Sequence, residues 1–178
     1  MKAIALKKLS TRDMAHIALA VSLNAVCAFL TIPATVPFTL QTFSIFFTLS
    51  YLGGRKGAIA VWLYIFFGAI GLPVFSGFHG GFSVLLSATG GFIMAFAAVA
   101  LLYFVLSFFK LPSWVQYPLA IFSLALIYFG GCAWFVFMIG GTLVHALLIC
   151  VVPFILPDLA KIVLAFLLSA RLSKVRIQ

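Results

Sequence analysis

The feature that most constrains this chain is how little charge it carries along its whole length. Of its 178 residues, 66% are hydrophobic and only 7% are charged. A soluble domain carries about 25% charged residues because its surface must meet water. A chain without such a surface needs lipid as its solvent. The sequence therefore predicts an all-α integral membrane protein, with residues 1–178 forming a single membrane domain.

The apolar segments set the expected number of crossings. At about 20 residues for each crossing, the length allows five to seven spans, and six fit the segments best. The expected helices are 13–32, 39–52, 57–69, 90–109, 114–138 and 157–171. The apolar stretch 140–153 is too short to cross alone, so we expect a half-helix or a re-entrant segment there.

The basic residues predict the orientation of these helices. With both termini in the cytoplasm, ten of the 11 Lys and Arg side chains fall on the cytoplasmic side. They are Lys2, Lys7, Lys8 and Arg12 in the N-terminal tail 1–12, followed by Arg55, Lys56, Lys110, Arg171, Lys174 and Arg176. The positive-inside rule predicts this asymmetry, which a five- or seven-span chain would lose. The net charge of +9 thus indicates membrane orientation and not binding to nucleic acid.

The three connections on the opposite side differ in composition. Residues 31–38, 71–89 and 139–153 contain no Lys, Arg, Asp or Glu and are rich in Pro and Gly. Irregular backbone is tolerated at membrane depth only where protein covers it or where it lines a cavity. We expect these connections to fold over a pocket that opens to the outside. Short turns are the alternative.

Two charged residues remain inside the predicted membrane region. Asp158 and Lys161 lie three residues apart, on one face of the last helix, whereas Asp13 lies beside Arg12 at the cytoplasmic end. Such groups cost at least about 2.5–3.5 kcal/mol each at the bilayer centre, and they usually mark ligand or ion paths. Pro157 suits the first helical position, which places the pair near the outer surface. Because a buried ion pair is a poor stabiliser, we favour ligand recognition over a salt bridge that only holds the helix.

Three stretches of the chain, in register, resemble a known family. They are PFTLQT at 37–42, the glycine-rich GAIGLPVF at 68–75 with 77–81 and 89–92, and PFILPDLAK at 153–161, which carries a D-x-x-K signature. These stretches are similar to the BioY family, the substrate-binding S-components of bacterial energy-coupling-factor transporters for biotin. The similarity covers nearly the whole chain in order and spacing.

The resemblance implies a six-helix subunit in the bacterial cytoplasmic membrane. Such a subunit captures biotin from outside with high affinity, next to a transmembrane coupling subunit and two ATPase subunits, without a cofactor or a metal. The resemblance places Asp158 and Lys161 against biotin: Asp158 would accept the ureido N–H bonds, and Lys161 would donate to the ureido oxygen or to the carboxylate. Gln41 is a further polar candidate. Phe38 and Phe75 are candidates for the pocket wall, or ordinary lipid-facing or core aromatic residues.

The first helix carries small residues at four-residue spacing. Ala18 and Ser22 form one stripe, and Ala20, Asn24 and Ala28 form another. Small residues let helices approach closely in lipid. In the family such a stripe docks on the coupling subunit, and Ala20 and Asn24 match it best. Packing inside this protein is the alternative.

The sequence argues against an enzyme. It has no G-x-x-x-x-G-K-[ST] phosphate loop and no nucleophile–base set, so transport would rely on separate ATPase subunits.

Three alternatives to a biotin S-component remain. They are a solitary carrier, in which Asp158 and Lys161 take part in proton coupling, an S-component for another vitamin, and a membrane scaffold. His79 is either a contact for an anionic ligand or a plain loop histidine.

Overall fold

The computed structural model describes residues 9–109 and 112–176, with side chains up to residue 173. The described part is mostly helical, and its helices are α1 (Thr11–Phe29), α2 (Gln41–Leu52), α3 (Gly54–Ala69), α4 (Phe82–Leu85), α5 (Gly90–Leu106), α6 (Gln116–Ile139), α7 (Leu143–Cys150) and α8 (Ile155–Arg176). There are also 3-10 turns, η1 (Ser76–Phe78), η2 (Ser113–Val115) and η3 (Val152–Phe154). A small antiparallel hairpin pairs β1 (Thr31–Ile32) with β2 (Phe38–Thr39).

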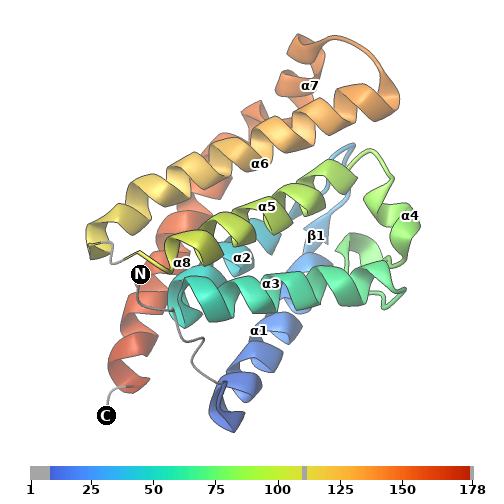
Figure 1. Ribbon diagram of the computed structural model, residues 1–178. Helices are drawn as coiled ribbons and strands as arrows, with labels where there is room; N and C mark the ends of the chain where they lie inside the picture. The colour runs from blue at the N-terminus through green and yellow to red at the C-terminus, as the bar shows by residue number, and fades with distance from the viewer. Residues whose placement is uncertain (1–8, 110–111, 177–178) are drawn as a thin grey trace.

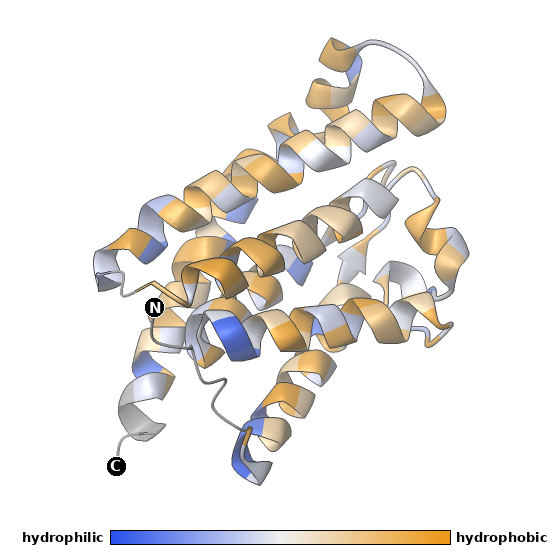
Figure 2. Cartoon of the chain, in the orientation of Figure 1, coloured by the Kyte–Doolittle hydropathy of each residue, from blue (hydrophilic) through white to orange (hydrophobic). Residues whose placement is uncertain are grey.

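The long helices pack around one core. In Figure 1, α5 lies between α3 and α6, and α2 packs against α8 on the other side of the bundle. Ile45, Val61 and Val99 have no exposed surface in this core. The helices are apolar along much of their length (Figure 2), and many of their large apolar side chains are exposed; Phe137, for example, is 78% exposed. Soluble monomers rarely expose apolar patches of this extent, so the outer surface suits lipid.

Each of the six long helices lies where the sequence predicts one, and the differences are at the ends. The first helix ends at Phe29, and residues 31–32 join the hairpin. Ile32 precedes Pro33, and a residue before proline disfavours the helical conformation. The last helix begins at Ile155 and not at Pro157. Pro157 is tolerated there because the first four N–H groups of a helix lack intrahelical partners. In the stretch 140–153, the structure contains the short helix α7.

Two described stretches are long and apolar enough to cross a membrane by length and composition, Ser113–Ile139 and Leu143–Ser173. The second one joins α7, η3 and α8. Helix α5 is apolar but shorter. The helical nature of the fold is therefore confirmed, and the count of six crossings stays a prediction.

The two ends of the bundle differ. The starts of α1 and α3 lie toward the same end as the C-terminal part of α8, away from α4, α7 and the hairpin (Figure 1). Lys56 of α3 forms an ion pair with Asp13 of α1 at this basic end. The predicted basic residues Lys2, Lys7, Lys8 and Lys110, and the side chains of Lys174 and Arg176, lie outside the described residues.

Glycine allows α5 and α6 to approach closely. A Cβ atom added to Gly91 would lie 2.2 Å from Trp134 Cβ and 2.9 Å from the carbonyl oxygen of Gly130. By contrast, a Cβ atom added to Gly130, in the same interface, would have Ala95 Cβ as its nearest neighbour, at 3.2 Å. Close helix contact of this kind is what small residues provide in membrane proteins.

We expect Gly91→Ala to lower the stability of the folded protein by about 1–3 kcal/mol, because its methyl group would overlap Trp134 and force α5 and α6 apart. Gly130→Ala is the matched control and should have little effect, since alanine also favours the helical state. Thermal unfolding of the purified variants in detergent measures both. Equal midpoints for the two variants would show that the α5–α6 contact is not as close as described.

Candidate functional site

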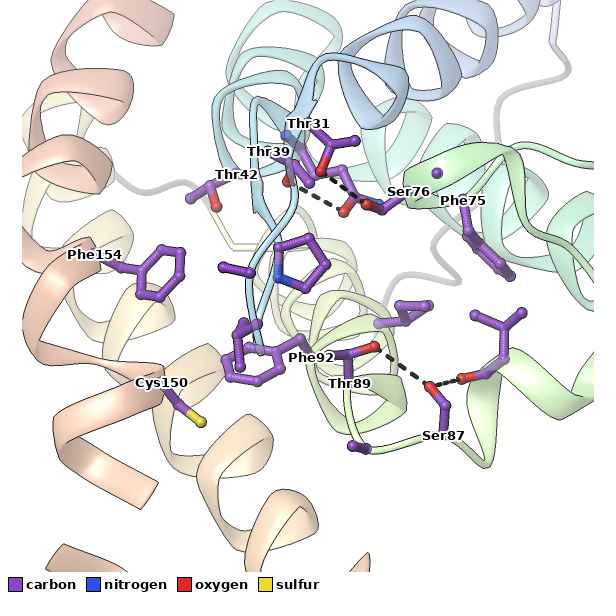
Figure 3. A pocket seen from close by; sticks show the side chains of 18 of the residues that line it. Thr31, Thr39, Thr42, Phe75, Ser76, Ser87, Thr89, Phe92, Cys150 and Phe154 are labelled. Atoms are coloured by element: carbon purple, nitrogen blue, oxygen red, sulfur yellow. Dashed lines mark hydrogen bonds between the residues drawn. The ribbon is translucent and has the colours of Figure 1, made fainter. Parts of the chain in front are cut away.

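A cavity of about 670 Å³ lies at the end of the bundle that carries the hairpin and α4. This volume falls in the range of roughly 300–1,000 Å³ that is typical of small-molecule sites. Figure 3 shows residues from three regions converging on it: Thr31 and Thr39 of the hairpin, Ser87 and Thr89 before α5, and Cys150 and Phe154 next to α8. The three connections that were predicted to fold over a pocket therefore contribute to its lining.

The cavity has a buried floor and an exposed mouth. Gln41, Phe75, Asp158 and Lys161 line it and are buried, and Phe96 of α5 adds an apolar surface to the floor. The exposed lining residues belong to the connections 31–38 and 71–89; among them are Ala34, Thr35, Gly77, His79 and Ser83. A ligand can therefore enter from the side of the connections and reach charged groups at the bottom.

Asp158 and Lys161 form the charged part of the floor. Both lie near the start of α8, three residues apart, and Lys161 Nζ is 2.8 Å from Asp158 Oδ1. The two residues are only 4% and 6% exposed. The predicted pairing on one helical face is confirmed.

The ammonium of Lys161 has three close partners. It donates to Asp158 and to the carbonyl oxygen of Thr39, the latter over 2.7 Å. Its Nζ also lies 4.0 Å from the centroid of the Phe38 ring, which is a favourable cation–π distance. Lys161 thus attaches strand β2 to α8.

The carboxylate of Asp158 has a second donor that the sequence analysis missed. The hydroxyl of Tyr128 in α6 donates to Asp158 Oδ2 over 2.9 Å. Tyr128 is one tyrosine within an apolar helix, and the sequence carries no signal that places it opposite α8. A carboxylate has about four lone-pair sites, so two remain for a ligand after Lys161 and Tyr128 are bound.

Gln41 and Phe75 line the pocket as predicted, on neighbouring elements. The amide of Gln41 donates to the hydroxyl of Tyr64 over 2.6 Å, and its carbonyl accepts from the hydroxyl of Thr39 over 3.3 Å. The ring of Phe75 meets that of Tyr64 edge-on, with centroids 5.7 Å apart. These contacts hold both side chains in one orientation at the floor.

Phe38 is not among the residues that line the cavity in this structure, and its contact with a ligand stays a prediction. Successive side chains of a strand point to opposite faces. Thr39 faces the cavity, and Phe38 turns to Lys161 and to Phe154, whose ring is 5.9 Å away. In this structure the Phe38 ring lies over the ammonium.

The predicted docking stripe on α1 is buried in this conformation, and its contact with a partner subunit stays a prediction. Ala20 is 8% exposed, and Asn24 has no exposed surface. They belong to the face of α1 that packs inside the protein, which was the alternative. The other stripe, Ala18 and Ser22, is exposed.

The structure also places the cysteine side chains and His79. No group of three His, Cys, Asp or Glu side chains within the described residues is arranged to hold a metal ion. The three cysteines, Cys27, Cys132 and Cys150, are buried and free. His79 lies at the mouth, with Nδ1 2.9 Å from the carbonyl oxygen of Ser76.

Comparison with known proteins gives a consistent result. The model of the BioY family matches residues 2–178. The probable biotin transporter BioY of Pyrococcus horikoshii is 33% identical over 92% of this chain and 98% of its own length. The biotin transporter BioY of Thermotoga maritima is 37% identical over 88% of this chain and 93% of its own. The crystal structure of the S-component for biotin from an ECF-type ABC transporter superposes with a TM-score of 0.82 at 26% identity, covering 94% of this chain and 95% of that one.

We expect Lys161→Met to destabilise the protein by about 3–5 kcal/mol, because it leaves the buried carboxylate of Asp158 without its counter-charge. The double variant Asp158→Asn/Lys161→Met should recover most of that loss, since neither charge remains. Lys56→Met, which breaks the more exposed pair with Asp13, is the control and should change stability far less. Thermal unfolding in detergent compares the three. A double variant no more stable than Lys161→Met would contradict a coupled pair.

Proposed function

The chain belongs to the BioY family, and on that premise we propose that it takes up biotin as the substrate-binding subunit of a transporter of the energy-coupling-factor type. Like its relatives, it is a transporter component and not an enzyme. The observation that carries the proposal is the buried Asp158–Lys161 pair at the floor of a cavity of small-molecule size. Groups of this kind are retained in an apolar bundle when a ligand uses them.

The ureido ring of biotin offers two N–H donors and one carbonyl oxygen. In the proposed complex, the free lone pairs of Asp158 accept the N–H bonds, which are about twice as strong as neutral hydrogen bonds because the acceptor is charged. Tyr128 and Lys161 hold the carboxylate in place for this contact. The apolar lining near Phe92 and Phe96 then receives the thioether ring.

The wider arrangement follows from the same proposal. Six helices cross the bacterial cytoplasmic membrane, both termini are cytoplasmic, and the cavity opens to the outside, where the connections between helices cover it. The energy comes from a coupling subunit with two ATPase subunits. The exposed stripe of Ala18 and Ser22 on α1 provides a surface of small residues where that coupling subunit can approach closely.

Substitution of Asp158 by Asn tests the ligand site. It keeps the size of the side chain and removes the charged acceptor, so we expect biotin affinity to fall by about 1.5–3 kcal/mol, the scale of a hydrogen bond to a charged group, which is tenfold or more in Kd. Asp13→Asn changes the chain's other acidic residue, away from the cavity, and should bind biotin normally.

Both variants are compared by binding of labelled biotin to purified protein. Uptake is then measured in a biotin-requiring bacterium that lacks its own importer, with and without the coupling module. Normal binding by Asp158→Asn would rule out the proposed contact. Uptake that persists without the module and collapses with the proton gradient would favour the solitary carrier.

The membrane topology can be tested by labelling cysteines from outside intact cells. In a background where Cys27, Cys132 and Cys150 are replaced by Ala, we expect Thr35→Cys to react with a membrane-impermeant maleimide. Ser113→Cys should react only after the cells are permeabilised. Both positions are exposed in the structure, and the six-span arrangement places them on opposite sides. Labelling of both from the same side would contradict that arrangement.

A further inference from the structure

The cavity contains one positive and one negative charge, and each neutralises the other. Asp158 and Lys161 are the only Asp, Glu, Lys or Arg among the described residues that line it. Lys161 already contacts Asp158, the carbonyl oxygen of Thr39 and the ring of Phe38. A ligand therefore meets no unpaired cation in the described lining.

Besides Lys161, His79 is the other basic side chain of the described lining. Its hydrogen bond limits which ligand groups it can bind. A carbonyl oxygen can only accept a hydrogen bond. The 2.9 Å contact with the carbonyl oxygen of Ser76 therefore places a ring hydrogen on Nδ1. In the neutral imidazole the other nitrogen, Nε2, is then an acceptor. In this neutral form the ring suits a ligand N–H group, and its Nε2 lone pair does not attract a carboxylate.

The rest of the mouth is uncharged. Thr35, Ser83 and Thr89 contribute hydroxyl groups, which can donate or accept, and Ala34 and Gly77 are exposed beside them. Because the mouth is exposed, a group attached to the outer end of a ligand can extend into water. The selective contacts are those at the floor.

These observations bear on the two ends of biotin. If the ureido ring lies against Asp158, the valerate tail runs from the floor toward the mouth and brings its carboxylate to the uncharged rim. Removing a carboxylate from water is costly unless a cation meets it. A neutral amide at the same position loses less hydration, and its N–H group can donate to Nε2 of His79.

We propose that the site selects its ligand by the ureido head and accepts a neutral amide in place of the tail carboxylate. Its substrate class is then biotin together with its tail amides, such as biotinamide and biotinyl-lysine. This inference rests on the proposed function and adds the prediction that the carboxylate contributes little to recognition.

Competition against labelled biotin on the purified wild-type protein tests the inference. We expect biotinamide and biotinyl-lysine to bind with Kd values within tenfold of that of biotin. Lipoic acid has a similar acidic tail but no ureido group, and it should not compete at a hundredfold excess. A biotinamide Kd more than tenfold weaker than that of biotin, or competition by lipoic acid, would overturn the inference. If labelled biotin itself does not bind, the proposed function fails instead.

A charge added at the mouth gives an independent test. His79→Lys replaces the acceptor by an ammonium. The ratio of the biotinamide Kd to the biotin Kd should rise at least fivefold, because biotin carries the carboxylate. His145→Lys is the matched control: it makes the same change at an exposed position of α7 that does not line the cavity, and the ratio should stay that of the wild type. An unchanged ratio in His79→Lys would show that the tail does not end at this rim.

Discussion

The ion pair between Asp158 and Lys161 is the interaction on which the rest of the site depends. Burying either charge alone in an apolar bundle would cost several kcal/mol, so each must be compensated locally. Lys161 meets this requirement with three contacts, to Asp158, to the backbone of Thr39 and to the ring of Phe38. Tyr128 completes the shell of the carboxylate. As a result, α8, α6 and the hairpin between α1 and α2 are connected through two side chains.

The connection has a consequence for the shape of the cavity. Strand β2 is attached to α8 by Lys161 and leads directly into α2, where Gln41 is held by Tyr64 of α3. The polar contacts at the floor therefore form a chain from α8 to α3, while α5 supplies an apolar wall with Phe92, Ile93 and Phe96. The close approach of α5 to α6, which Gly91 permits, keeps this wall next to the helix that carries Tyr128. Polar groups that are fixed in this way need little reorganisation when a ligand binds.

Several parts of the fold and the site were predictable because they depend on neighbouring residues. Hydropathy indicated lipid and the position of each long helix, and the spacing of Asp158 and Lys161 predicted a shared face. The sequence could not decide the orientation of a side chain where two faces of one element compete. Phe38 was expected in the pocket wall, but the alternation of the strand turns it to the ammonium. Ala20 and Asn24 were expected at a docking surface, yet of the two stripes of small residues on α1, theirs packs inside the protein.

The sequence by itself determined the apolar environment, the order of the helices and the presence of two charges one turn apart, because composition and periodicity are local properties of the chain. Only the tertiary structure decided which groups surround those charges. Tyr128 reaches Asp158 from 30 residues away, and the carbonyl oxygen of Thr39 reaches Lys161 from 122 residues away. Contacts of this kind depend on the packing of helices that are distant in sequence, and no local pattern encodes them.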